Sequence, residues 1–276
     1  MKKHFSTLLI ILVILLGASL LLYPTVSDYW NSLRQSRAIA DYVEKINGID
    51  SEKYAEILEE ARKYNARLAS TPHTLILDKQ QREEYNKLLN VTDNGIMGYI
   101  DIPDISCHLP IYHGISDDVL QIAVGHMDGS SLPVGGENTH AVLSGHRGLP
   151  SAMLFTDLDK LVTGDTFIIT VLNELMTYEI YDIATVLPHE VDSLKIEKGK
   201  DLCTLVTCTP YGVNSHRLLL KGRRIENIEE APVIHVVSEA SRIQPLAVMP
   251  AIAIPILLVF ILVLFIKPNK KTKDYT

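Results

Sequence analysis

The sequence has 276 residues, enough for one domain of ordinary size with further segments at its ends. Its formal net charge is −7 at pH 7, and because both ends are basic, the middle is more acidic than the whole. An acidic domain binds nucleic acid poorly, which excludes that class of partner. Three cysteines leave at least one thiol without an intramolecular partner, which excludes a disulfide-rich scaffold.

Two uncharged apolar stretches are each longer than the roughly 20 residues needed to cross a bilayer. The first, residues 5–27, follows Lys2 and Lys3, and the second, residues 243–266, is followed by a lysine-rich tail. The positive-inside rule then predicts that both termini are cytoplasmic and that the intervening segment is exported. The first stretch could instead be a cleaved signal peptide, but its apolar run continues past Gly17, which favours a retained anchor.

Helical periodicity predicts two helices after the first apolar stretch. One carries apolar residues from Trp30 to Ile46 and ends at Asn47-Gly48, and the next begins near Ser51 and continues to Leu68. We expect these helices to form a hairpin that packs on the domain. The following residues, 69–94, predict a loop with a short helix.

From Gly95 onward the chain consists of short β-type runs separated by Gly, Pro and Asp. The predicted strands are residues 96–100, 105–112, 140–143, 166–172, 176–186, 202–208 and 216–220. With few helices between them, these strands predict a mainly β fold, either a closed barrel or a sandwich.

One stretch, residues 204–217, contains chemistry that a plain strand does not need. The strand ends at Cys208, Pro210 and Gly212 mark a turn, and Arg217 begins the next strand. A strand tip holds a side chain rigidly while leaving it open to substrate. A small buried cysteine beside a surface arginine explains the local pattern equally well.

A cysteine nucleophile needs a partner that exchanges protons near neutral pH, and histidine is the natural one. Among the ten histidines, His146 stands in Ser-Gly-His-Arg-Gly, where a predicted strand breaks into a turn. His216 is the rival because it lies in the same hairpin as Cys208. Since it is adjacent to Arg217 on a strand, however, it should point to the opposite face. Spacing alone does not decide between the two histidines.

Thr-Leu-Val-Thr-Cys, followed nine positions after the cysteine by Arg217, resembles the signature of the sortases, membrane-anchored cysteine transpeptidases of Gram-positive bacteria. The longer run through Thr-Pro-Tyr-Gly-Val-Asn and on to Arg-Leu-Leu resembles class C, the pilin-polymerising branch, more than the housekeeping branch. Ser-Gly-His-Arg-Gly resembles the histidine motif of the family, and residues 102–103 and 109–114 resemble its early strands. The resemblance implies a closed sortase-type β-barrel of about eight strands with short helices, preceded by a helical hairpin and flanked by two transmembrane helices.

The resemblance also implies roles for individual residues. Cys208 would attack a peptide carbonyl and form a thioester, His146 would exchange protons with the leaving and entering amines, and Arg217 would donate to the oxyanion or the nearby substrate backbone. Thr207 and Thr204 are expected at the substrate site, Thr207 facing away from Cys208 and orienting the site rather than reacting.

The implied substrate is an LPxTG-like sorting signal cut between Thr and Gly, and the implied acceptor is a pilin lysine. Attachment of proteins to peptidoglycan is the alternative. The other expected partner is membrane lipid around the two spans. No cofactor is implied, and the absence of C-x-x-C and H-E-x-x-H patterns argues against a zinc site.

Class C sortases often carry a lid loop with an Asp-Pro-aromatic motif before the first barrel strand. Residues 69–94 contain no such motif, and Thr71-Pro72-His73 is the nearest match. Without an aromatic ring we expect a lid that is mobile, or closed only through contacts of Leu75, Ile76 and Leu77.

The expected organisation is an N-terminal tip and anchor or signal sequence (1–27), helices with a lid-like loop (28–94), the catalytic barrel (95–226), a linker (227–242), a transmembrane helix (243–266) and a basic cytoplasmic tail (267–276).

Two other functional classes compete with a transpeptidase. A papain-like hydrolase would carry its cysteine before its histidine, whereas here His146 precedes Cys208. A non-enzymatic, doubly anchored envelope scaffold would retain its function when Cys208 is replaced.

Overall fold

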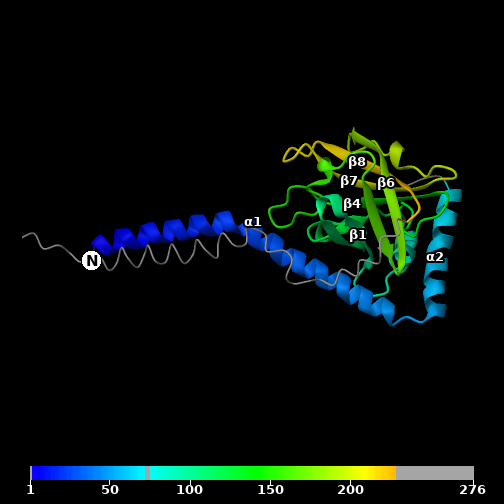
Figure 1. The fold of residues 1–276 in the computed structure, drawn as a ribbon, viewed down its shortest axis with the longest axis horizontal. Coiled ribbons are helices and arrows are strands. Elements are labelled where there is room, and N and C mark those ends of the chain that lie inside the picture. Colours follow the sequence, from blue (N-terminus) through cyan, green and yellow to red (C-terminus); the bar gives the residue numbers. More distant parts are fainter. Residues whose placement is uncertain (1, 72–74, 228–276) are drawn as a thin grey trace, which may run out of the picture. The chain divides into compact units, whose positions relative to one another are not determined.

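The computed structural model describes residues 2–71 and 75–227 (Figure 1). They fall into two units, the first 29 residues and the residues from Trp30 onward. The predicted second span at 243–266, the basic tail and the linker beyond Asn227 lie outside the described residues.

The first helix, α1 (Lys2–Asn47), is continuous through Pro24, where the sequence pattern predicted two separate segments. No glycine lies between Pro24 and Asn47 to interrupt it. Within the described part of the chain, α1 is the one helix long and apolar enough to cross a membrane, a test that a signal sequence also passes. This apolar segment fits a membrane anchor.

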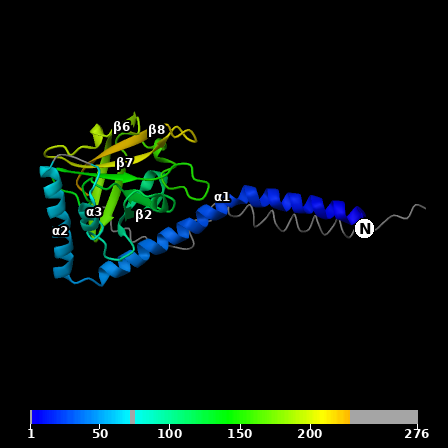
Figure 2. The same ribbon diagram turned by 180° about the vertical axis from the view of Figure 1, so that it is seen from behind.

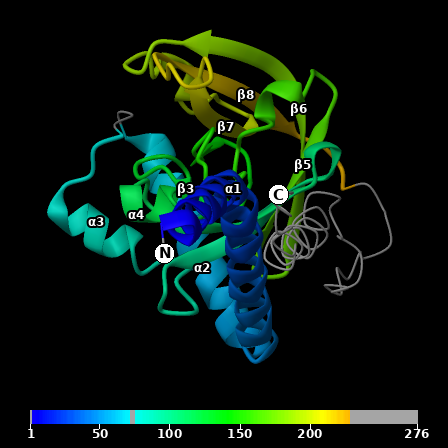
Figure 3. The same cartoon turned by 90° about the vertical axis from the view of Figure 1, so that its left-hand side faces the viewer.

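Eight strands close into a barrel in the order β1-β2-β3-β4-β7-β8-β6-β5, which confirms the predicted sortase-type architecture. The strands are β1 (Ile96–Ile102), β2 (Cys107–His113), β3 (Val124–His126), β4 (Thr139–Ser144), β5 (Thr166–Val171), β6 (Glu174–Val186), β7 (Asp201–Thr209) and β8 (His216–Arg224). The helices after α1 are α2 (Ser51–Ser70), α3 (Lys79–Tyr85) and α4 (Asp117–Leu120), with short 3-10 turns η1 (Pro103–Ile105), η2 (Leu158–Lys160) and η3 (Asp192–Leu194). Figure 3 shows β6, β7 and β8 side by side.

Alternation along β7 sends its side chains into two different apolar clusters. Cys203 and Leu205 belong to the main core inside the barrel, which the other strands also line. Val206, on the opposite face, packs with Val142, Leu194 and Leu219 in a second, smaller cluster. Because side chains repeat every second residue, Cys208 lies on the face of this smaller cluster.

The helical hairpin is docked on the barrel through buried polar contacts, and Figure 2 shows α2 beside it. The Tyr42 hydroxyl donates to the Met97 carbonyl at 2.8 Å and accepts from the Leu172 N–H at 2.8 Å. In α2, the Asn65 amide bonds both the carbonyl and the N–H of Leu132, at 3.0 and 2.7 Å. A buried backbone group left unpaired would be costly, so these contacts fix the helices against specific strands and loops.

The lid-like region is held down more firmly than the missing motif suggested. Tyr85, at the end of α3, is fully buried, and its hydroxyl lies 2.9 Å from Nδ1 of His126. Leu77 is buried, Leu75 packs against the smaller cluster, and Ile76 is exposed. In residues 75–94, two of the three expected contacts, those of Leu75 and Leu77, are therefore present, and the Tyr85 ring adds buried apolar area outside the missing motif.

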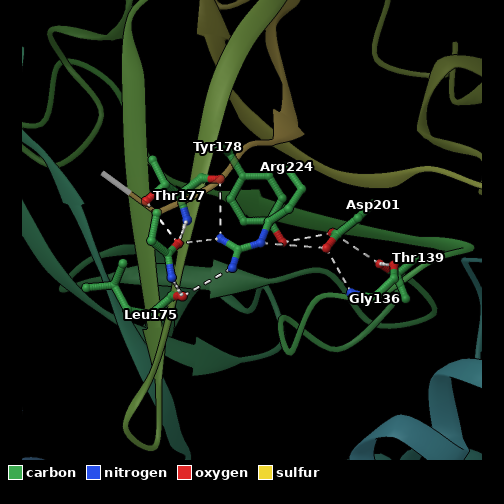
Figure 4. Close-up of polar contacts among 8 residues, drawn as sticks. Gly136, Thr139, Leu175, Thr177, Tyr178, Asp201 and Arg224 are labelled. Carbon is green, nitrogen blue, oxygen red and sulfur yellow. Dashed lines mark hydrogen bonds and ion pairs between the residues drawn. The ribbon is translucent and has the colours of Figure 1, made fainter. Parts of the chain in front are cut away.

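A polar network fixes the end of the barrel where β7 begins (Figure 4). The Asp201 carboxylate accepts from the Gly136 N–H at 2.8 Å and the Tyr178 hydroxyl at 3.0 Å. Arg224 lies 4.0 Å from the same carboxylate and donates to the Asn227 side chain at 3.0 Å. The network ties β6, β7 and β8 to one loop at the end of β7 opposite Cys208.

Candidate active site

Cys208 and Arg217 face each other across two neighbouring strands. They are direct partners in the antiparallel register of β7 and β8, one pair along from Thr209 and His216. Directly opposed residues point to the same face with Cβ atoms about 5 Å apart. Arg217 is steadied by hydrogen bonds from Nη1 to the carbonyls of Asn214 and His216, at 3.2 and 3.1 Å. The thiol and the guanidinium can therefore reach one bound carbonyl group.

His146 lies just after the end of β4, the strand on the other side of β7 from β8. β4 and β7 run parallel, and their last paired residues are Ser144 and Val206. The Gly145 N–H continues the pairing by donating to the Val206 carbonyl at 3.1 Å. Two residues beyond this last pair, the segment that follows β4 carries His146 and β7 carries Cys208. The three predicted catalytic residues thus lie at the same end of β4, β7 and β8.

Thr207 and Thr204 are buried in the barrel wall, with 2% and 0% of their surface exposed. The Thr207 hydroxyl donates to the carbonyl of Gly145 at 2.8 Å, and the Thr204 hydroxyl lies 2.7 Å from Nε2 of His140. Neither side chain offers surface to a substrate. The Thr207 hydroxyl is instead hydrogen-bonded to the residue that precedes His146.

The loop after His146 is supported by residues that the sequence pattern did not reveal. The buried Phe155 donates its N–H to the His146 carbonyl at 3.1 Å, and its ring lies under Gly145. A Cβ at Gly145 would come within 2.6 Å of that ring, so only glycine allows this approach. Asn31 of α1 also donates to the carbonyl of Ser151, further along the same loop, at 2.8 Å. The segment that contains His146 is therefore held in place by contacts with Phe155, and the loop that follows it is held by Asn31.

The rival histidine, His216, is paired with Thr209 in the register and neighbours Arg217 on β8. Adjacent strand residues point to opposite faces, so His216 faces away from Arg217 and Cys208. Its Nδ1 lies 2.9 Å from the Ser215 hydroxyl.

The three thiols differ in their surroundings. All three cysteines are free, but only Cys208 is partly exposed. Burial raises the pKa of the Cys107 thiol and raises the pKa of the Cys203 thiol well above its usual range. Because the thiolate is the nucleophile, buried thiols of this kind are unreactive. Among the described residues, no group of three His, Cys, Asp or Glu side chains could hold a metal ion.

Acyl transfer through a thiol needs a nucleophile, a proton carrier and a donor for the oxyanion within reach of one carbonyl. The end of the barrel that carries Cys208, His146 and Arg217 can supply all three, as expected of a β-barrel cysteine acyltransferase. Residues 100–225 match the model of the sortase domain. The chain belongs to the sortase family, whose members are cysteine transpeptidases.

Solved structures of sortases C resemble the chain over most of their length. A crystal structure of sortase C1 from Streptococcus agalactiae is 49% identical, with a TM-score of 0.68 over 70% of this chain and 100% of that one. Sortase C from Clostridium perfringens, solved with the C-terminal cell wall sorting motif, is 43% identical, with a TM-score of 0.61 over 70% of this chain and 100% of that one. A curated relative, sortase A from Streptococcus agalactiae, is 36% identical over 117 residues, 41% of this chain. That match spans about half of the relative, 47% of its length.

Proposed function

We propose that this protein is a pilin-type transpeptidase that cleaves an LPxTG-like sorting signal between Thr and Gly and transfers the acyl group to a lysine amine of a pilin. The observation that carries the proposal is the pairing of Cys208 with Arg217, with His146 on the adjacent strand end. The similarity to sortases C, one of them described with a cell wall sorting motif, supports the choice of substrate.

In the first half-reaction the Cys208 thiol gives its proton to His146, its sulfur attacks the Thr carbonyl carbon, and the C–N bond to Gly breaks. His146 gives its proton to the leaving amine, so that the products are a thioester and a free amino terminus. In the second half-reaction the lysine amine loses a proton to His146 and attacks the thioester carbonyl. An amide forms and the Cys208 sulfur leaves.

Arg217 donates hydrogen bonds to the oxygen of the tetrahedral intermediate in both half-reactions. The register that places it opposite Cys208 supports this assignment. A lysine at position 217 would keep the charge but lose the planar arrangement of donors. We expect Arg217→Lys to lower turnover about 100-fold, the usual effect of losing an oxyanion donor. Near-normal turnover of this variant would remove Arg217 from the oxyanion site.

The proposal is tested by incubating the full chain with a sorting peptide and either a lysine-containing pilin peptide or an oligoglycine acceptor. The expected product joins the sorting peptide to the lysine side chain. Cys208→Ala and His146→Ala should yield none, and Cys107→Ala, a substitution of a buried thiol away from the site, should retain product formation. A preference for oligoglycine would favour peptidoglycan attachment. If neither acceptor gives a product, the proposal that the protein is a transpeptidase is refuted.

We also propose the arrangement in the membrane. The apolar segment of α1 supports an N-terminal anchor. With the lysine-flanked apolar stretch 243–266 as a second span, the catalytic domain lies outside the cell and both termini lie in the cytoplasm. The proposed domain boundaries place the catalytic barrel at residues 95–226. Protease added to intact protoplasts should digest the barrel and spare an epitope tag placed after Thr276, and digestion of that tag would contradict the topology.

A further inference from the structure

The loop between β7 and β8 makes a contact that the catalytic steps above do not use. The loop is closed by the Pro210 carbonyl, which accepts from the N–H groups of Val213 and Asn214 at 3.1 and 2.9 Å. Tyr211, in this loop, is 61% exposed. Its ring nevertheless lies against the Arg147 guanidinium, whose carbon is 5.8 Å from the ring centroid.

The same ring also packs on Gly148. A Cβ added at Gly148 would come within 2.7 Å of the Tyr211 ring, and the residue has a φ of +75°. The positive φ favours glycine at this position, and the absence of a Cβ lets the ring lie close to the backbone. Because Arg147 and Gly148 directly follow His146, Tyr211 presses on the two residues that lead out of the catalytic histidine.

The far side of this segment is held by other contacts. Arg147 has only 10% of its side chain exposed and is ion-paired with Asp159. The Gly148 N–H donates to the Thr156 hydroxyl at 3.0 Å. The segment after His146 is therefore held between η2 and its neighbouring residues on one side and the ring of Tyr211 on the other.

We propose that Tyr211 is a positioning residue, which acts through Arg147 and Gly148 to hold His146 beside Cys208. The β7–β8 loop also orients Arg217, through the Asn214 carbonyl. The β7–β8 loop would thus hold the segment after His146 through the Tyr211 ring, and Arg217 through the Asn214 backbone carbonyl. This inference rests on the proposed function for its effect on turnover.

The test compares three variants of the full chain. Tyr211→Ala removes the ring, and Tyr211→Phe keeps it. Val213→Ala is the matched control, because Val213 lies in the same loop and is 70% exposed, while the ring that contacts Arg147 and Gly148 is that of Tyr211. The measurements are single-turnover acylation by a sorting peptide, the KM for that peptide, the pH dependence of Cys208 alkylation, and the unfolding temperature.

We expect Tyr211→Ala to lower the acylation rate at saturating peptide about tenfold or more while KM changes less than about threefold, because misplaced catalytic groups slow the chemical step. The pH profile of Cys208 alkylation should shift, since a nearby imidazole favours the thiolate. Tyr211→Phe and Val213→Ala should match the wild type in both readouts, and all three variants should unfold at nearly the same temperature.

Equal acylation rates in Tyr211→Ala and Val213→Ala would overturn the proposal. A rise in KM alone would mean that Tyr211 contacts the peptide, and an equal loss in Tyr211→Phe would assign the effect to the hydroxyl, so each of these outcomes also overturns it. If the wild type is acylated by no sorting peptide, the proposed function fails. The alkylation profile needs no substrate and then decides the positioning role by itself.

Discussion

Thr207 and Thr204 allow a matched pair of substitutions that separates support of the active site from stability alone. Thr207→Val removes the hydroxyl that donates to the Gly145 carbonyl at 2.8 Å, and Thr204→Val removes the hydroxyl 2.7 Å from His140. Each substitution removes one buried side-chain hydrogen bond, which contributes about 1 kcal/mol. For a domain of roughly 200 residues, each kcal/mol lowers the unfolding temperature by about 2–4 °C.

The two variants should therefore lose similar stability but differ in activity. Gly145 precedes His146, so we expect Thr207→Val to lower the single-turnover acylation rate about tenfold, while Thr204→Val acylates at nearly the wild-type rate. Acylation is measured by quenched mixing and intact mass, at a temperature where both variants are folded. Equal acylation rates in the two variants would refute the idea that Thr207 positions the histidine. A higher KM with an unchanged rate in Thr207→Val would instead mean that its hydroxyl touches the substrate.

Three further predictions concern thiols, the lid-like region and pH. Cys208 should be the only thiol alkylated quickly in the native chain, because burial raises the pKa of the Cys107 and Cys203 thiols. Mass mapping that finds Cys107 or Cys203 labelled first would contradict this prediction. Leu75→Ala should raise the alkylation rate of Cys208 a few-fold at most, since one half-buried leucine contributes about 1 kcal/mol, whereas a hundredfold rise would reveal a tight lid. Burial lowers the pKa of His126 from 6.5 to about 4, so the neutral form stabilises the fold above pH 6.5. That stabilisation, up to about 3 kcal/mol, should be lost as the pH falls from 6.5 towards 4, and in denaturant titrations His126→Gln should lack this loss. Identical pH profiles for the two proteins would rule out the contribution of His126.

The strands of the barrel could be predicted because short alternating runs are bounded by Gly, Pro and Asp. The facing of Cys208 and Arg217 was also accessible, since a strand, a marked turn and a second strand bring their tips together. β3 was not foreseen, because three residues are too few to show alternation.

The residues that hold the candidate catalytic residues in place do so through contacts between segments far apart in the sequence, and no local sequence pattern reveals such contacts. Phe155 packs under Gly145 from a loop, so nothing in its sequence neighbourhood reveals the approach. Tyr85 buries its ring against His126, from a helix too short to show an apolar stripe. For the same reason the sequence predicts Thr204 and Thr207 at the substrate site, whereas their hydroxyls bond to His140 and Gly145 inside the barrel wall.

The central claim is that Cys208 forms a thioester with a cleaved sorting signal. It is tested most directly by incubating the full chain with an LPxTG-containing peptide without an acceptor amine, and then measuring the intact mass and mapping the adduct. We predict a mass increase equal to the peptide portion ending in Thr, located on Cys208, released by hydroxylamine and absent in Cys208→Ala. An adduct on Cys107 or Cys203, or an unchanged mass with every sorting peptide, would contradict it.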